Sequence, residues 1–448
     1  MLVLLSDIHL TDGTSGTTIN PRAFQKFGNI LLDIIGENKP PLPPVEKIEL
    51  VLLGDIFDVI RSEVWLDQKT QKPKQPIRPW SAPDEVDGNG ANLEDYTKRI
   101  VNGIINNPEN IKIMGYLEEF QKECKEKKVN AVKFTYLAGN HDWLINRFPS
   151  TRLAIAKFLR MPDWEYYEKN PFPLYQKFPL YGVMARHGDC YDPLNYSGDR
   201  NASSLGDALV IDLLNHFPQE VKEDLEKAWV EPDVVESIYR QLKEIDNVRP
   251  LLEIPAWIKS VCRYYPDREG TIHDVWNRLA AQFFQIPYVQ DFVRTNWFLG
   301  KLLKLALRLT SGISFSGLTA ILAGKTIRRW YQNANDYKAY AMKEPALKDE
   351  RVKYVVYGHT HYADQVPLDV APIKNQLNEG KEKIRETLDR LYFNSGTWRR
   401  VYEHTASDWF NCEFIGWHVL TFLIFYLKNE KEPDRNYEEW SASLGYGR

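Results

Sequence analysis

Short apolar runs alternate with stretches of helical periodicity over the first part of the chain. The apolar runs at residues 2–5, 48–53 and 132–137 have the length and composition of buried strands. Between them, residues 21–35 and 96–127 repeat apolar side chains at helical spacing. Strands that alternate with helices predict an α/β architecture rather than an all-β one.

The pattern changes at about residue 191, after a further strand signal over residues 181–186. From there to residue 349 strand signals nearly vanish and helical periodicity dominates. Strand signals return afterwards in four segments, which are residues 352–357, 391–393, 398–402 and 415–427. We therefore expect a discontinuous α/β core, residues 1–190 and 350–448, interrupted by a helical insertion or cap, residues 191–349, with the length of an ordinary domain.

Composition narrows the class of protein without naming a function. Of the 448 residues, 43% are hydrophobic, 26% are charged and 13% are aromatic, which excludes a disordered chain. The formal net charge of −4 argues against a surface built throughout for nucleic acid. The four cysteines lie far apart and form no CxxC pair, so neither a disulfide framework nor a zinc knuckle is indicated. A reducing, cytoplasmic setting is the expectation.

Three apolar segments were candidates for membrane or targeting functions. The first residues, MLVLLSDIHL, hold an apolar run too short for a secretory signal. Residues 309–324 and 415–427 are each shorter than the roughly 20 residues that a spanning helix needs. We therefore expect no transmembrane span.

Five short polar motifs each directly follow a predicted strand. They are Asp7-Ile8-His9, Gly54-Asp55-Ile56-Phe57-Asp58, Gly139-Asn140-His141-Asp142, His187-Gly188-Asp189 and Gly358-His359-Thr360-His361. Ligands of α/β sheets collect outside the carboxyl ends of the strands, so these loops can converge although they span most of the chain. Carboxylate, amide and imidazole groups suit manganese, iron or zinc. The sequence therefore predicts a metal site at the carboxyl ends of the predicted strands.

In this order, the DxH, GDxxD, GNHD, HGD and GHxH motifs resemble the signature of the calcineurin-like metallophosphoesterase superfamily. The resemblance covers about residues 1–189 and 352–398, and it implies a four-layer α/β/β/α sandwich. It also implies two divalent metal ions, with manganese expected first and iron or zinc as alternatives. One ion would be held by Asp7, His9, Asp55 and His361, and the other by Asp55, Asn140, His187 and His359.

The same resemblance implies hydrolysis of a phosphoric ester or anhydride bond. Two ions about 3.5–4 Å apart can clamp the attacking and leaving oxygens and activate a bridging hydroxide for in-line attack on phosphorus. The resemblance makes Asp55 the bridging carboxylate and lets His141 contact the phosphate and stabilise the leaving group. Asp58 and Asp142 are candidates for orienting the ligand histidines.

Longer segments around four of these motifs indicate one group within the superfamily. LLSDIHL, LLGDIFDVI, LAGNHDWLINRF and ARHGDCYD resemble the UDP-diacylglucosamine pyrophosphatase group of the lipid A pathway. That group typically has arginine where this chain has His141, and its insertion is much smaller. The substrate therefore stays open between a phosphorylated small molecule, a nucleotide conjugate and a lipid-linked compound.

The insertion contains a basic stretch, residues 292–335, with no acidic residue. Within it, Lys301, Lys304 and Arg308 fall at helical spacing beside apolar residues. A basic amphipathic helix can contact substrate phosphate or lie peripherally on an anionic membrane, and the alternative is a packed helix with a solvated basic side.

Two further functions remain open. A DNA or RNA nuclease of the same superfamily is opposed by the acidic net charge. A metal-free interaction scaffold on this fold is opposed by the presence of every expected ligand residue.

Overall fold

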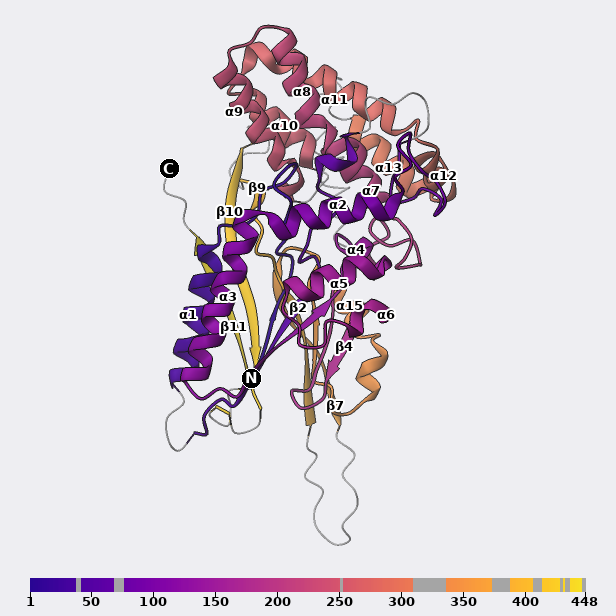
Figure 1. Ribbon diagram of the computed structural model, residues 1–448. Helices are drawn as coiled ribbons and strands as arrows, with labels where there is room; N and C mark the ends of the chain where they lie inside the picture. Colours follow the sequence, from indigo (N-terminus) through magenta and orange to yellow (C-terminus); the bar gives the residue numbers. More distant parts are fainter. Residues whose placement is uncertain are drawn as a thin grey trace.

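The protein is a mixed α/β structure with two mixed sheets and a helical region, as seen in a computed structural model (Figure 1). The structure describes residues 1–37, 42–67, 76–249, 253–308, 336–372, 387–405, 413–427, 430–431 and 436–444.

The first sheet has the strand order β11-β10-β1-β2-β3, with β9 paired to β10. Its strands are β1 (Leu2–Leu5), β2 (Lys47–Leu53), β3 (Ala131–Leu137), β9 (Val401–His404), β10 (Phe414–Phe425) and β11 (Tyr437–Leu444). The first three are parallel, while β10 runs antiparallel to its neighbours. Every residue of β1 is buried, which explains its continuous apolar run.

The second sheet has the strand order β4-β5-β6-β8-β7. Its strands are β4 (Tyr175–Phe178), β5 (Val183–Arg186), β6 (Tyr354–Tyr357), β7 (Ala363–Pro372) and β8 (Thr387–Ser395). The inner strands β5, β6 and β8 are parallel, and the two edge strands are antiparallel. The predictions missed β4, β7 and β11, which are all edge strands with many polar residues.

The two sheets share one apolar core. Leu4 and Val51 of the first sheet belong to the same buried cluster as Val356 and Phe393 of the second. Because side chains alternate across a strand, the neighbouring residues point the other way. Those of the first sheet pack with α1 (Arg22–Glu37) and α3 (Pro108–Glu126), and those of the second pack with α15 (Tyr337–Ala341), as the separate clusters on each outer face show.

The single helix predicted over residues 96–127 is wrong, because the structure has two helices there. The first is α2 (Leu93–Asn106), and α3 begins at Pro108. Asn107 between them has an extended backbone, and its side chain accepts a hydrogen bond from the amide of Glu109. Proline is favourable at the first position of a helix, so this pair of residues ends one helix and starts the next.

The described part of residues 191–349 contains helices and no strand. The helices are α7 (Leu205–Leu209), α8 (His216–Lys227), α9 (Pro232–Leu242), α10 (Ile254–Cys262), α11 (Glu269–Phe283), α12 (Pro287–Thr295), α13 (Trp297–Arg308) and α15. Figure 1 shows α8 to α11 at the end of the molecule away from the N-terminus, so this region faces the carboxyl ends of β1, β2 and β3.

Shorter helical elements complete the described chain. After β3 come α4 (Trp143–Arg147), α5 (Pro149–Phe158) and α6 (Tyr166–Lys169). Single turns and irregular helices are η1 (Glu63–Trp65), η3 (Asp189–Tyr191), η4 (Val210–Leu214), η5 (Lys243–Asn247), η7 (Pro266–Arg268) and η8 (Pro345–Lys348). Among the residues described, no helix combines the length and the apolar character needed to cross a bilayer. The apolar segment of residues 309–324 lies outside the described part.

Candidate metal centre

The loops after five strands bring the predicted ligands together. Three groups of side chains each have their ligand atoms within 4.8 Å of one another. They are Asp7, His9 and His361; His9, Asp55 and His141; and Asp55, His187 and His359. Because His9 and Asp55 each belong to two groups, the three form one continuous site that could bind metal ions.

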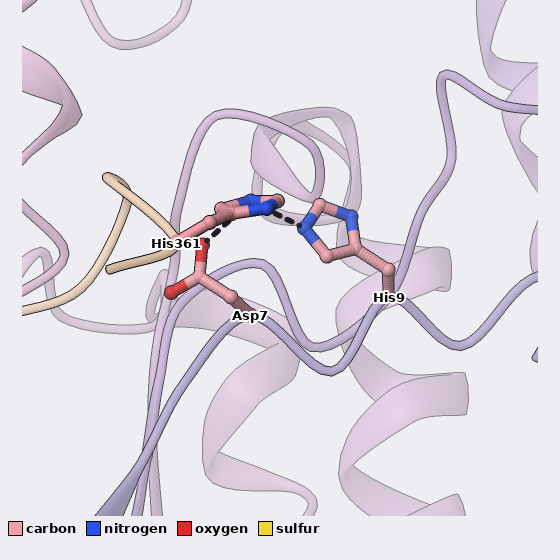
Figure 2. A group of neighbouring side chains, drawn as sticks. All are labelled: Asp7, His9 and His361. Atoms are coloured by element: carbon pink, nitrogen blue, oxygen red, sulfur yellow. Dashed lines mark hydrogen bonds and ion pairs between the residues drawn. The ribbon is translucent and has the colours of Figure 1, made fainter. Parts of the chain in front are cut away.

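The first group joins the two sheets (Figure 2). Asp7 and His9 follow β1, whereas His361 follows β6 of the other sheet. Nε2 of His361 lies 3.3 Å from Oδ1 of Asp7 and 3.3 Å from Nε2 of His9. An oxygen and two ring nitrogens therefore converge at the junction of the sheets.

The third group has Asp55 at its centre. Nε2 of His187 lies 3.1 Å from Oδ2 of Asp55. Nδ1 of His187 lies 3.0 Å from the carbonyl oxygen of Leu53, which can only accept, so Nδ1 carries a hydrogen. In the neutral ring this tautomer leaves Nε2 available as a metal ligand. Nε2 of His359 lies 3.2 Å from Oδ2 of Asp192.

The backbone at the site is held in an unusual conformation. Eight non-glycine residues with positive φ are found in the described chain, and five of them are predicted ligands. These are Asp7 (φ 52°), His9 (φ 53°), Asp55 (φ 51°), His359 (φ 71°) and His361 (φ 63°). The left-handed conformation costs an L-residue about 1–2 kcal/mol, so its concentration here indicates a functional constraint.

Two glycines permit the close approach of the loops. A Cβ atom on Gly139 would lie 2.3 Å from Oδ1 of Asp55. A Cβ atom on Gly54, which has a φ of 79°, would lie 2.5 Å from the ring of His187. The glycines of the second and third motifs are therefore needed for packing around Asp55.

Three predicted ligand atoms are buried and have no hydrogen-bond partner among the described residues. They are Oδ1 of Asp7, Oδ1 of Asn140 and Nε2 of His187. Oδ1 of Asp7 lies against Nε2 of His361, which is another predicted ligand. Nε2 of His187 likewise lies against Oδ2 of Asp55. Buried polar atoms are normally paired, because an unpaired one costs about 1–3 kcal/mol. A divalent cation accepts electron pairs from this kind of oxygen and nitrogen atom, so the donor set fits a metal ion.

Asp58 holds two of the imidazoles. Its Oδ2 lies 3.0 Å from Nδ1 of His9, and its Oδ1 lies 2.9 Å from Nδ1 of His141. Asp142 makes different contacts, since it accepts hydrogen bonds from the backbone amides of Gly139 and Ile56. Asp58 thus contacts the histidines, whereas Asp142 shapes the backbone of the turn that follows β3.

Mutual attraction shifts the pKa values of Asp55, His141 and His187 so that each group favours its charged form. Burial opposes ionisation of Asp55, but attraction to His187 and His141 outweighs it and lowers the Asp55 pKa. Burial likewise opposes protonation of His141, yet Asp58 and Asp55 raise the His141 pKa to about 9. Asp55 and Asp7 similarly overcome the burial of His187 and raise its pKa to about 9. Without a metal ion, these histidines supply the positive charge that the carboxylates require.

A cavity of about 960 Å³ opens onto the site. From the metal centre it is lined by Asp55, Asn140, His141, His359 and His361. From the helical region it is lined by Leu205, Leu209, Val210, Asp246, Arg249 and Leu303. The helical region therefore forms part of the wall of this site.

The structure describes the side chains of two of the three basic residues predicted to contact substrate, and neither lines this cavity. Lys301 is exposed, with its ammonium group 4.0 Å from the centre of the Trp297 ring. Lys304 lies 5.5 Å from the ring of Phe284. Among the described residues, neither lysine lines the cavity, and nothing is described of the Arg308 side chain. The predicted contact between these residues and substrate stays a prediction.

Sequence reasoning missed Arg249, Asp192 and Asp246. Arg249 lines the cavity, and its Nη2 lies 3.2 Å from Nδ1 of His361. Arg249 and Asp246 belong to no motif after a predicted strand, so the sequence offered no signal for them beyond their charge. Asp192 ends the ARHGDCYD segment, and its position just after the HGD motif could have identified it.

No protein-family model and no curated protein matches the chain. The class of the site therefore rests on its geometry, which is that of buried Asp and His clusters able to hold metal ions in a mixed α/β protein.

Proposed function

We propose that the protein is a dimetal-dependent hydrolase of phosphoric ester or anhydride bonds, a metallophosphoesterase. The observation that carries the proposal is the continuous set of buried carboxylates and imidazoles, in which three ligand atoms have no hydrogen-bond partner among the described residues. The proposal is also supported by the position of these residues after parallel strands, because ligands of α/β sheets collect there.

In this proposal Asp7, His9, Asp55 and His361 hold one ion, and Asp55, Asn140, His187 and His359 hold the other. The proximity of these side chains in the first and third of the three groups supports the division. When bound, two divalent cations supply an activated water and offset the negative charge of the phosphoryl group. The mixture of oxygen and nitrogen donors favours manganese, with iron or zinc as alternatives.

His141 is the proposed proton donor to the leaving oxygen. It lines the cavity, and Asp58 fixes its ring through Nδ1. The pKa of about 9 keeps its imidazole protonated at neutral pH in the metal-free protein. A positioned acid in the correct protonation state contributes typically about 10²–10⁴-fold to a rate.

We also propose the four-layer α/β/β/α sandwich as the core, residues 1–190 and 350–448, with residues 191–349 as its cap. The apolar cluster shared by the sheets and the separate clusters on their outer faces support the layers. The contribution of the helical region to the cavity wall supports a cap that selects the substrate.

The proposed substrate is a phosphorylated small molecule, a nucleotide conjugate or a lipid-linked compound rather than nucleic acid. The cavity volume lies within the usual range for small-molecule sites. Six carboxylate residues besides Asp55 line it, namely Asp192, Asp246, Glu253, Asp336, Asp364 and Glu403. A polyanion binds surfaces rich in cations, so this lining disfavours the nuclease alternative. Peripheral membrane contact through the exposed Lys301 remains part of the proposal.

The test is a hydrolysis screen with added manganese over monoesters, diesters, nucleoside diphosphate conjugates and nucleic acids. We expect metal-dependent turnover of at least one small substrate, lost in Asp55→Asn and retained in Asp291→Asn. Asp291 is an exposed control of the same residue type, paired with Arg294 on α12. Equal activity of Asp55→Asn and the wild type would overturn the proposal.

A further inference from the structure

Four buried charged residues lie behind the imidazoles of the metal centre. Asp58, Arg61, Asp246 and Arg399 are each at most 5% exposed. Nη1 of Arg399 lies 2.8 Å from Oδ2 of Asp246 and 3.6 Å from Oδ2 of Asp58. Nε of Arg61 lies 3.8 Å from the same oxygen of Asp246. Buried charges are costly unless they are paired, so these residues form one mutually dependent network.

One end of the network determines where two imidazoles point. Both oxygens of Asp58 face a ring, Oδ2 facing His9 and Oδ1 facing His141. Oδ1 also accepts a hydrogen bond from the backbone amide of Arg61 at 3.0 Å. A small shift of this carboxylate would therefore move or release both rings.

The other end belongs to the helical region. Asp246 lies in η5, and the same turn is tied to the core by Nη2 of Arg61, which donates to the carbonyl oxygen of Lys243 at 2.9 Å. Two residues after η5, the amide of Arg249 donates to the carbonyl oxygen of Tyr402 at 2.9 Å. Asp246 is thus held firmly beside Arg399.

We propose that Asp246 is a positioning residue of the metal centre, which acts from the helical region through Arg399 and Asp58 on His9 and His141. Arg399 is shared between two carboxylates, and the shorter contact is to Asp246. If Asp246 lost its charge, Arg399 would have Asp58 as its nearest remaining carboxylate in this network. Arg399 would then compete with Nδ1 of His9 for Oδ2 of Asp58. The consequence for metal binding and turnover rests on the proposed function.

The test compares the full-length wild type with Asp246→Asn, which keeps the side-chain shape. Manganese affinity is measured by calorimetry, and the ring N–H signals of His9 and His141 are followed by NMR of the metal-free, ¹⁵N-histidine-labelled protein. We expect affinity to fall about 10-fold, the low end for groups that orient metal ligands, and kcat to fall with little change in KM. The two ring signals should broaden or shift.

Glu236→Gln is the matched control, since Glu236 is a partly exposed acid of α9 paired with Arg240 and Lys222. It should leave affinity and ring signals unchanged. Arg399→Lys alters the same contact between Arg399 and Asp246 from the side of Arg399. It replaces Asp246→Asn in the experiment if that variant does not fold. Wild-type affinity and ring signals in a folded variant would overturn this inference alone. A wild type that binds no manganese would overturn the proposed function instead, while the metal-free ring signals would still test the link.

Discussion

His141 stands apart from the other histidines of the site in its environment. Its Nδ1 is bound to Asp58, its backbone amide donates to Oδ1 of Asp55 at 2.8 Å, and its side chain lines the cavity. Asp58 thereby holds the ring through Nδ1, Asp55 holds the backbone of the same residue, and the side chain stays accessible from the cavity. This arrangement suits a group that gives a proton to a departing oxygen.

His141→Gln should therefore lower kcat by an amount that depends on the leaving group. We expect a loss of about 10²-fold or more for an alkyl phosphate ester, whose oxygen departs only when protonated. The loss should be much smaller for a 4-nitrophenyl ester, because nitrophenolate leaves without a proton. His273→Gln on α11 is the control. An equal loss with both leaving groups would show that His141 does not act as the acid.

The stability of the metal-free protein should also depend on pH through these histidines. The pKa values of His187 and His141 are raised to about 9, so they bind protons more tightly in the folded state than in the unfolded one. Their contribution is fully present below the unfolded pKa of about 6.5 and is lost as the pH rises through about 9. We expect the unfolding temperature of the chelator-treated protein to fall between pH 7 and 9.5.

The matched variant is His187→Asn, in which this decrease should be smaller. The difference between the two proteins is the relevant quantity, because burial lowers the pKa of the Met1 amino group in the folded protein and this group also contributes to the pH dependence. Parallel curves for wild type and variant would contradict the raised pKa of His187.

At the scale of elements, the loops after β2 and β3 pack so closely that a single methyl group should disturb the site. Gly139→Ala would place a Cβ atom 2.3 Å from Oδ1 of Asp55 and 2.7 Å from its backbone nitrogen. We expect this variant to lose manganese affinity at least 10-fold and to be destabilised by about 1–3 kcal/mol, as for other overpacked sites. Calorimetry and thermal unfolding measure the two effects.

Gly115→Ala provides the comparison, because Gly115 is exposed on α3 and an added Cβ would meet nothing within 4 Å. Alanine is a better helix former than glycine, so this variant should gain about 0.5–1 kcal/mol with unchanged metal affinity. If both substitutions left metal binding intact, the packing account of the second and third motifs would be refuted.

The elements that sequence patterns predicted well are those whose environment is uniform. β1, β6 and the last four residues of β2 are buried on both faces and therefore read as continuous apolar runs. By contrast, β7 contains two prolines and several polar residues, and its pairing with β8 is set by tertiary context rather than by its own composition. The motifs after the parallel strands were predictable because parallel strands end at one edge of a sheet.

At the scale of the whole molecule, the helical region is tied to the core by buried charges as well as by apolar packing. Arg61 donates to Oδ1 of Asn215 at 2.8 Å and to the carbonyl oxygen of Lys243, while Arg399 reaches Asp246. No pattern in the sequence distinguishes these buried arginines from surface cations. Their partners lie more than 150 residues away along the chain for Arg61 with Asn215 and for Arg399 with Asp246, so only the folded structure identifies them.

The central claim is that the Asp and His clusters form a binding site for two metal ions. It is tested most directly by equilibrium dialysis of the full-length protein against manganese, followed by metal analysis of wild type and Asp55→Asn. We predict two ions per wild-type chain and a loss of at least one in the variant, because Asp55 belongs to both proposed ligand sets. A folded wild-type protein that retains less than one ion per chain with manganese, iron or zinc would contradict the claim.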